Sequence, residues 1–375
     1  MRENPRSSDK QSFPFKMFAP GKINHFHSQL LNWFARQKRE MPWRKNLDPY
    51  RILVSEFMLQ QTQVKTVIPY FNKWMRSFPT VKRLAAAKES DVLKHWEGLG
   101  YYSRARNLLR SAIQIQNDHS GKVPDTFQEM MRLPGVGRYT AGAVLSIAFD
   151  QKVPVLDGNV KRVLSRLMLL NENGSNKKSE TRLWETMESL LPDKSCGDFN
   201  QAFMELGATV CLPQNPLCEE CPLKKLCKAK LSGKQELYPP KKTAAKISKI
   251  KVSAAVIFRK GHVYIQKRKG KGLMGGLWEF PGGKREAGET EEECLRREIK
   301  EELGVNIRIG EKIVTHRHSY TRFRVTLDVF QCRIHSGKLS PTECDEWKWV
   351  KPEELDQFPF PAANVKIIKL LNKNT

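Results

Sequence analysis

Apolar residues recur every three or four positions along the N-terminal half of the chain, which predicts amphipathic helices. Asp48 followed by Pro49 marks one helix start, because Asp caps helix N-termini and proline fits the first helical turn. No strand-like alternation precedes Cys211, so this part is predicted to be all-α. The predicted helices cover residues 23–39, 50–71, 90–96, 103–116, 139–149, 160–170, 181–190 and 199–209.

The period changes from helical to alternating after about residue 250. Strands are predicted over 252–259 and 262–267, across a Lys260–Gly261 turn, and near 322–332 and 346–350. A helix follows the glycine-rich stretch 275–283, so the C-terminal part is predicted to be α+β. We expect a flexible leader (1–20), an all-α domain (21–228), a Lys-rich linker (229–250) and an α+β domain (251–375).

The large positive net charge indicates that the protein binds a polyanionic partner. Lys and Arg number 65 against 40 Asp and Glu, giving a formal charge of +25. No stretch approaches the ~18 consecutive apolar residues of a membrane span, and the N-terminus lacks the apolar core of a signal peptide. The charge indicates nucleic acid or an anionic membrane surface as the partner, and the missing apolar segments predict a cytoplasmic protein. Of these partners we expect nucleic acid and no membrane, for a monomer of bacterial type that meets DNA in the nucleoid.

Four cysteines lie within seventeen residues, and in a reducing compartment such a group indicates metal binding. They are Cys211, Cys218, Cys221 and Cys227. A four-cysteine zinc site usually joins two short Cys pairs, whereas only one C-x-x-C occurs here. Four cysteines also ligate a [4Fe–4S] cluster. From the residues alone, both an iron–sulfur cluster and zinc remain open.

Two further features suggest chemistry. Gly135 and Gly137 form a tight turn before the helix that contains Tyr139, and the free amides of a helix N-terminus attract phosphate. Asp157 follows eighteen residues after Tyr139 and precedes another helix. The plain alternative is a structural turn with Asp157 as an N-cap. Glu56 lies on the helix that begins at Asp48, where most glutamates are merely solvated.

These stretches together resemble a known family. Residues 133–166 resemble the helix-hairpin-helix and Gly-Pro-Asp signature of the base-excision DNA glycosylase superfamily. The motif SEFMLQQT (55–62) closely resembles one in adenine DNA glycosylases of MutY type, and GLGYYSRAR (98–106) matches a second family segment. The cysteine spacing resembles the cluster loop of adenine glycosylases and endonuclease III, and this resemblance favours a [4Fe–4S] cluster, with zinc as the alternative.

The resemblance implies a monofunctional glycosylase that removes adenine mispaired with 8-oxoguanine or guanine in duplex DNA. Breaking an N-glycosidic bond requires an acid on the leaving base and a negative charge near the sugar. Glu56, in a desolvated pocket that raises its pKa, and ionised Asp157 are expected to fill these roles, with Asn159 orienting Glu56 or the water. Tyr139 stands where bifunctional members have the Schiff-base Lys. The expected DNA contacts are Gln61, Thr62, Leu99, Tyr101, Gly135 and Gly137.

Residues 283–305 fit the whole Nudix pattern, which places Glu298, Glu301 and Glu302 on one helix face where they suit Mg²⁺. A solvated acidic helix is the plain alternative. In the glycosylase family this domain reads 8-oxoguanine, which implies that role for Tyr320 and Thr321, although Arg322 replaces a family histidine. The segment 360–364 resembles a base-reading motif of MutT ending in Asn364, and hydrolysis of 8-oxo-dGTP is a further expectation.

The sequence thus predicts an all-α helix-hairpin-helix glycosylase domain with an iron–sulfur loop, followed by an α+β Nudix-like domain. One alternative is a Nudix pyrophosphohydrolase that uses its helical half to reach DNA. Another is a structural DNA-binding iron–sulfur protein without enzymatic activity. The pairing of Glu56 with Asp157 argues against the last, since a pure binder needs neither acid.

Overall fold

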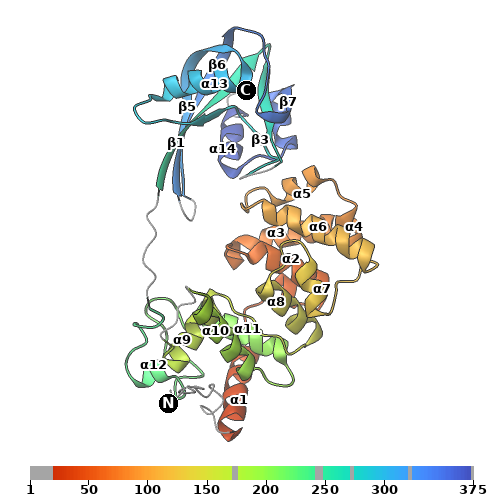
Figure 1. The fold of residues 1–375 in the computed structure, drawn as a ribbon, viewed down its shortest axis with the longest axis vertical. Helices are drawn as coiled ribbons and strands as arrows, with labels where there is room; N and C mark the ends of the chain where they lie inside the picture. The colour runs from red at the N-terminus through yellow and green to blue at the C-terminus, as the bar shows by residue number, and fades with distance from the viewer. Residues whose placement is uncertain (1–19, 171–175, 241–247, 271–273, 320–322, 373–375) are drawn as a thin grey trace, which may run out of the picture. The chain divides into compact units, whose positions relative to one another are not determined.

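The regular elements up to Leu231 are all helical, as the apolar pattern predicts. The structure is a computed structural model that describes residues 20–170, 176–240, 248–270, 274–319 and 323–372 (Figure 1). Its N-terminal elements are α1 (Pro20–Gln37), the 3-10 turn η2 (Pro42–Arg44), α2 (Pro49–Leu59), α3 (Val64–Ser77), α4 (Val81–Ala85), α5 (Glu89–Trp96), α6 (Ser103–Asp118), α7 (Phe127–Arg132), α8 (Arg138–Phe149), α9 (Gly158–Met168), α10 (Lys177–Leu190), α11 (Cys196–Thr209) and α12 (Lys228–Leu231).

The polypeptide divides into two compact units that do not follow chain order. The first unit is Met1–Gln61 with Gln114–Thr243, and the second is Thr62–Ile113 with Ala244–Thr375. The stretch that holds α3, α4 and α5 therefore belongs with the C-terminal part. The expected leader falls on residues outside the described part, apart from Pro20 at the start of α1.

The single helix predicted over residues 50–71 is wrong. The chain breaks into α2 and α3 at Gln60–Gln63, and Gln61 has a φ of 56°, in the left-handed region. The start is as predicted, because the Asp48 carboxylate accepts hydrogen bonds from the Tyr50 and Arg51 amides at 2.8 and 3.3 Å. Glutamine and threonine do not forbid a helix, so the pattern of residues 60–63 carried no breaking signal.

Aromatic side chains fill the core of the first unit. Phe26 on α1 packs edge-on against Phe199 and Phe203 of α11, with ring centroids 5.9 and 6.0 Å apart. All three side chains are fully buried. α11 also packs against α8 and α9, and α2 packs against α8. Helices α8, α9 and α11 therefore share one apolar core, and α2, which carries Glu56, packs against α8.

The C-terminal part of the second unit is built on a mixed sheet. Its strands are β1 (Ser248–Arg259), β2 (His262–Arg268), β3 (Trp278–Glu279), β4 (Gly282–Lys284), β5 (Asn306–Ser319), β6 (Phe323–Ser336) and β7 (Cys344–Val350). The order is β3-β2-β1-β6-β5, with β4 paired to β1 and β7 to β2; β1 and β6 run parallel and the other pairs antiparallel. The linker expected over 229–250 includes α12, and β1 begins at Ser248.

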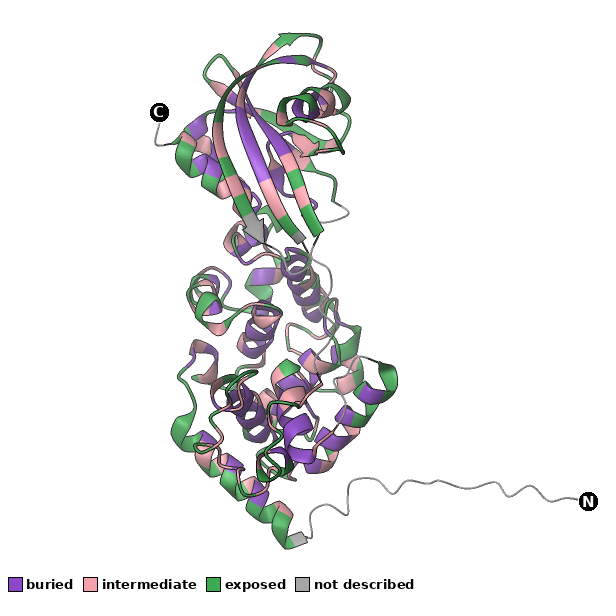
Figure 2. Ribbon diagram, turned by 90° about the vertical axis from the view of Figure 1, so that its left-hand side faces the viewer, coloured by how far each residue is buried: buried purple, intermediate pink, exposed green. Residues whose placement is uncertain are grey.

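Alternating residues of β1 face two different cores. Ala255 and Ile257 pack with Leu295 and Ile299 of α13 (Glu291–Leu303). Val256 belongs to the other core, together with Ile367 and Ile368 of α14 (Ala362–Leu371). The 3-10 turn η3 (Pro352–Gln357) precedes α14. Figure 2 shows the resulting buried central strands with exposed ends. The α+β class is confirmed, with helices on both faces of the sheet.

Strand β5 is not predicted by the sequence pattern. Its register against β6 shifts between Asn306 and Ile307, between Ile309 and Lys312, and again between Lys312 and Val314. Each shift breaks the alternation of apolar and polar positions on which strand prediction depends. Among the helices that the structure describes, none combines the length and apolarity required to cross a lipid bilayer.

The aromatic core gives a stability prediction. We expect Phe203→Ala to lower the free energy of unfolding by about 3–5 kcal/mol, because it removes a fully buried ring and leaves a cavity. Urea unfolding followed by circular dichroism measures the change. Met131→Ala is the control, since Met131 is 41% exposed and should change stability by under about 0.5 kcal/mol. Equal effects of the two substitutions would contradict this account of the core.

Candidate active site

Glu56 is a buried carboxylic acid in the middle of a helix. It lies on α2, which packs against α8, and the residue is 5% exposed. Its Oε2 atom is buried without a hydrogen-bond partner. The Tyr139 hydroxyl donates a hydrogen bond to the Glu56 carboxylate, and the Arg44 guanidinium acts on it through its charge. Burial has therefore replaced water around this carboxyl with very few polar groups.

Asp157 lies close to Glu56 and is held by several donors. Its Oδ1 accepts the Val160 amide at 2.7 Å, so Asp157 is indeed the N-cap of α9. Its Oδ2 accepts Nδ2 of Asn159 at 3.0 Å. The plain interpretation of Asp157 as a cap is thus correct as far as it goes. It does not exclude chemistry, because the same carboxylate interacts electrostatically with Glu56.

Desolvation dominates the protonation of both acids. Burial raises the pKa of Glu56 to about 7, the Asp157 charge raises it further, and Tyr139 and Arg44 oppose the change. Burial also raises the pKa of Asp157, against the hydrogen bonds from Val160 and Asn159 and the charge of Arg162. The desolvated environment expected for Glu56 is present. The two carboxyls differ mainly in how many donors each receives.

Tyr139, Asn159 and two residues that sequence reasoning missed complete the surroundings. The Tyr139 hydroxyl oxygen also lies 3.2 Å from Sδ of Met204. The Arg162 Nη2 atom donates to Oδ1 of Asn159 at 2.8 Å and to the Gly207 carbonyl at 2.7 Å. Arg162 lies one turn after Asn159 on α9, a spacing that was a usable signal. Met204 lies far away in sequence, and nothing in the pattern indicated it.

The predicted hairpin is present between α7 and α8. Gly135 has a φ of 77°, a left-handed conformation that favours glycine, and Gly137 is the N-cap of α8. Both glycines are exposed, and no side chain caps this helix. The α8 N-terminus therefore presents backbone amides to solvent.

The remaining predicted DNA contacts lie on two loops. Gln61 is exposed, and the Thr62 hydroxyl accepts a hydrogen bond from Nη2 of Arg104 at 3.1 Å. Tyr101 is 43% exposed with a φ of 48°, whereas Leu99 is buried. Arg104 also donates to the carbonyls of Leu99 and Gly100. The loop between α5 and α6 is thus held from within and presents Tyr101.

The four predicted metal-ligating cysteines lie near one another in space. The charges of Cys211, Cys218 and Cys227 each raise the pKa of the Cys221 thiol, after burial as the largest cause. Arg166 donates from Nη1 to Sγ of Cys211 at 3.3 Å. Within the described ranges, no three His, Cys, Asp or Glu side chains are gathered closely enough to hold a metal in this arrangement. The donor set, four thiols beside a guanidinium, nevertheless fits an anionic iron–sulfur cluster.

In the C-terminal part, Arg297 links the acidic residues of the Nudix pattern. It donates from Nε to Glu289 Oε1 at 2.7 Å and from Nη1 to Glu298 at 3.0 Å and Glu301 at 3.2 Å. The hydrogen bonds from Arg297 lower the pKa of Glu289. These three acids therefore share one cation.

Glu302 is in a different environment from Glu298 and Glu301. It accepts hydrogen bonds from Nε2 of Gln266 at 3.0 Å and from the Gly282 amide at 3.3 Å. Burial, followed by the charge of Glu279, raises the pKa of Glu302 to about 7. Glu279 and Gln266, which the sequence analysis did not single out, thus belong to this site.

Of the three residues predicted to contact 8-oxoguanine, the structure describes one. Tyr320 and Thr321 lie outside the described residues. Asn364 lies in the first turn of α14 and is buried. Its backbone N–H donates a hydrogen bond to the Pro361 carbonyl at 2.8 Å. Trp347 on β7 is 44% exposed and stacks on Tyr264 with ring centroids 6.0 Å apart.

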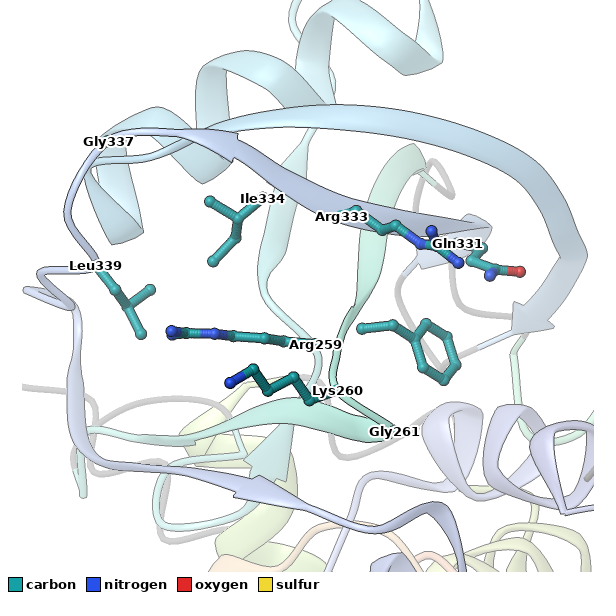
Figure 3. A pocket seen from close by; sticks show the side chains of 9 residues that line it. Arg259, Lys260, Gly261, Gln331, Arg333, Ile334, Gly337 and Leu339 are labelled. Atoms are coloured by element: carbon teal, nitrogen blue, oxygen red, sulfur yellow. The ribbon is translucent and has the colours of Figure 1, made fainter.

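A pocket of about 760 Å³ lies at the β1–β2 turn of the C-terminal sheet. Figure 3 shows Arg259 and Lys260 extending from the β1–β2 turn, with Arg333 on β6. None of its lining residues is a predicted site residue. The surface is basic, in keeping with the charge of the chain.

Three family models match the chain. A model of the HhH-GPD superfamily of base excision DNA repair proteins matches residues 54–189. The iron–sulfur binding domain of endonuclease III matches residues 211–227, and the NUDIX domain matches residues 253–370. These matches cover the hairpin, the cysteine loop and the C-terminal sheet in turn.

Individual relatives agree with these models. An adenine DNA glycosylase of Rattus norvegicus is 33% identical, with 96% of this chain and 81% of that protein aligned. One from Buchnera aphidicola subsp. Acyrthosiphon pisum is 35% identical, with 93% of this chain and 98% of that protein aligned. Among solved structures, a thermostable thymine-DNA glycosylase is 32% identical with a TM-score of 0.52, covering 56% of this chain and 98% of that one.

The hairpin, the paired acids and the matched models define a base-excision repair DNA glycosylase with an endonuclease III-type iron–sulfur binding loop and a Nudix domain. Iron–sulfur is thereby favoured over the zinc alternative. More specifically, the chain belongs to the adenine DNA glycosylase (MutY) family, whose members are N-glycosyl hydrolases of base excision repair. The non-enzymatic alternative is excluded.

The burial of Glu56 gives a prediction about stability and pH. The pKa of Glu56 is about 7 in the folded chain against 4.5 when unfolded, so the folded state binds this proton more tightly. Below pH 4.5 the Glu56 carboxyl is neutral in both states and does not lower the stability of the fold. As pH rises from 4.5 through 7, ionisation of the buried carboxyl progressively lowers the free energy of unfolding. Neutral Gln avoids the penalty, so Glu56→Gln should be more stable than wild type by about 2–4 kcal/mol at pH 8.

The difference should shrink towards zero at pH 4.5, measured by urea unfolding across this range. Glu188→Gln serves as the matched control, because Glu188 is exposed on α10. A stability difference between Glu56→Gln and wild type that does not change with pH would show that Glu56 titrates normally.

Proposed function

We propose that this adenine DNA glycosylase removes adenine paired with 8-oxoguanine or guanine in duplex DNA, without cleaving the strand. The observation that carries the proposal is a buried acid, Glu56, with a pKa of about 7 and an oxygen that lacks a partner, beside a second carboxylate, Asp157. Two carboxyls in different environments are the groups that glycosidic bond cleavage requires.

Glu56 acts as general acid in the proposed reaction. Protonated Glu56 gives its proton to a ring nitrogen of the adenine as the bond between the base and C1′ breaks, and the bonding electrons leave with the base. The sugar becomes oxocarbenium-like. Water then adds to C1′ and loses a proton to the Glu56 carboxylate, which restores the acid.

Asp157 stabilises the positive charge on the sugar. The Val160 amide and Asn159 Nδ2 hold its two oxygens, so the carboxylate is oriented before the substrate arrives. Asn159 is itself fixed by Arg162. Asn159 therefore positions Asp157 rather than contacting Glu56 directly.

The reaction is proposed to stop at base removal. Strand cleavage by this superfamily's bifunctional members requires an amine nucleophile that forms a Schiff base. Tyr139 occupies the corresponding position, and its buried hydroxyl has a raised pKa because of desolvation and the nearby Glu56 and Asp157 charges. A neutral phenol at that position hydrogen-bonds the acid instead of attacking the sugar.

Adenine inside a duplex is unreachable, so the nucleotide must be turned out of the stack. Exposed Tyr101 and Gln61 are proposed to enter the duplex, with Thr62 beside them. Leu99 is buried, so its insertion requires the loop to rearrange. The Gly135 and Gly137 amides at the α8 N-terminus would bind a phosphate.

The cysteine loop is proposed to hold a [4Fe–4S] cluster through Cys211, Cys218, Cys221 and Cys227. Such a cluster would brace a loop rich in lysine, and lysines contact backbone phosphates without reading sequence. All the proposed groups come from one chain, and we propose that the enzyme acts as a monomer on double-stranded DNA.

The function is tested with duplexes that carry A:8-oxoG, A:G, A:T and T:G pairs, followed by alkaline cleavage of abasic sites. Wild type should release adenine from the first two only, and without alkali the strand should stay intact. Release of thymine from T:G, or strand cleavage before alkali, would contradict the proposed specificity or the monofunctional mechanism, respectively.

Two substitutions test the roles of the acids. Glu56→Gln should lose about 10²–10⁴ in single-turnover rate, since it cannot donate the proton. Asp157→Asn should also be severely impaired, although Asn caps helices as well as Asp does and the fold should persist. Glu188→Gln should react as wild type. Near-normal turnover by Asp157→Asn would reduce that residue to a helix cap.

A second function is proposed for the Nudix domain, which would read 8-oxoguanine opposite the adenine and hydrolyse 8-oxo-dGTP. The specific support is the complete set of acids around Arg297 and the buried Glu302–Glu279 pair. Glu298, Glu301 and Glu302 would hold Mg²⁺, which would neutralise phosphate oxygens. Tyr320, Thr321 and Asn364 are proposed to contact the oxidised base.

Hydrolysis is tested with the full chain, 8-oxo-dGTP and Mg²⁺. Wild type should release the nucleoside monophosphate, and Glu301→Gln combined with Glu302→Gln should abolish release while adenine excision from A:G continues. No monophosphate from wild type would eliminate the hydrolase function. Equal release by the double variant would identify a contaminant.

A further inference from the structure

The segment that leads to Asn364 is tied to the loop that carries Leu99 and Tyr101. Both belong to the second compact unit. Glu97, the residue before the loop, accepts the Phe360 amide on Oε1 at 2.9 Å. The Tyr102 hydroxyl, at the other end of the loop, donates to the Phe360 carbonyl at 3.1 Å. One residue thus bonds to both ends of the loop.

The sequence around Phe360 explains why an outside partner is needed. Pro359 and Pro361 flank Phe360 and have no N–H, so the Phe360 amide is the single donor of this tripeptide. Phe360 is fully buried, and a buried amide without a partner is costly. The carboxylate of Glu97 satisfies that amide with a charge-assisted hydrogen bond.

A third side chain strengthens the connection. The Lys94 Nζ atom donates to Glu97 Oε2 at 2.8 Å and to the Phe358 carbonyl at 3.1 Å. The Glu97 side chain is 15% exposed and Tyr102 is 4% exposed, so solvent competes weakly for these bonds. Lys94, Glu97 and Tyr102 together bind the backbone of residues 358–360 from one side.

A separate contact joins the same parts of the second unit. A methyl group placed on Gly276, in the turn before β3, would lie 2.9 Å from Nη2 of Arg106 on α6. Arg106 is held in place by Glu89 at 2.9 Å. The guanidinium of Arg106 on α6 therefore lies next to the turn before β3, which is a second place where these two parts of the second unit are close to each other.

We propose that Glu97, Tyr102 and Lys94 are positioning residues that couple 8-oxoguanine reading to the duplex-entering loop. Their contacts transmit the placement of Asn364, four residues after Phe360, to Gly98–Tyr102. The preference for A:8-oxoG over A:G then depends on this connection. The proposal rests on the proposed function, in which the C-terminal part reads the lesion.

The coupling predicts an effect on one substrate only. When guanine lies opposite adenine, the reader has no oxidised base to bind, so the connection transmits nothing. Glu97→Ala should therefore lower the A:8-oxoG to A:G ratio of kcat/KM about tenfold, which is on the order of the net contribution of one hydrogen bond. Excision from A:G should stay within about threefold of wild type. Glu97→Gln keeps an acceptor for the Phe360 amide and should restore much of the ratio.

Asp91→Ala is the matched control, an exposed acid on the same helix, and should leave the ratio unchanged. Tyr102→Phe removes only the hydroxyl and should lower the ratio as Glu97→Ala does. It replaces Glu97→Ala in this test if the Glu97→Ala protein does not fold. Hydrogen exchange gives a second measurement. Binding of an A:8-oxoG duplex should slow exchange over residues 98–102 in wild type but not in Glu97→Ala.

The outcomes separate the two proposals. If wild type does not prefer A:8-oxoG over A:G, lesion reading itself fails. If wild type shows the preference and both Glu97→Ala and Tyr102→Phe keep it, the coupling is overturned. An equal loss on both substrates would also overturn it, because it would show a purely structural role.

Discussion

The exclusion of water from the Glu56 carboxyl is the constraint on which the site depends. A carboxylic acid in water is ionised at neutral pH and has no proton to give. α2 places Glu56 against α8, where burial raises its pKa to about 7. That placement requires the aromatic core around α11, because α8 and α9 both pack on that helix. The pKa of Glu56 thus depends on the packing of α2 against α8.

The two acids of the site show how a fold places identical functional groups in different environments. Glu56 has one unpartnered oxygen, whereas both oxygens of Asp157 accept hydrogen bonds. Donors favour the ionised form and desolvation favours the neutral one. The geometry of an N-cap therefore serves two purposes in Asp157, since it starts α9 and also supplies the donors that oppose protonation.

The C-terminal part repeats this division in another setting. Arg297 compensates Glu289, Glu298 and Glu301, while Glu302 shares a buried environment with Glu279. A divalent cation would favour the ionised form of the Glu302 and Glu279 carboxyls. Residues 62–113 belong to the same compact unit as this domain. The second compact unit therefore combines two segments that are far apart in the sequence.

The sequence by itself determined the local features. Helical period, the Asp48 cap, the hairpin glycines and the cysteine spacing all depend on neighbours within a few residues, and each is present in the structure. It also indicated Glu56 and Asp157 as a pair through their resemblance to a family. It did not indicate the break at Gln61, where no residue type forbids a helix, or β5, whose register shifts interrupt the alternation.

Only the tertiary structure decided the contacts between residues far apart in the chain. Met204 beside Tyr139, Gln266 beside Glu302 and Phe360 against Glu97 are separated by tens to hundreds of residues. A periodic pattern states which face of an element is buried, but not which element covers it. The pKa of Glu56 depends on that covering, so the chemistry of the site was decided by packing.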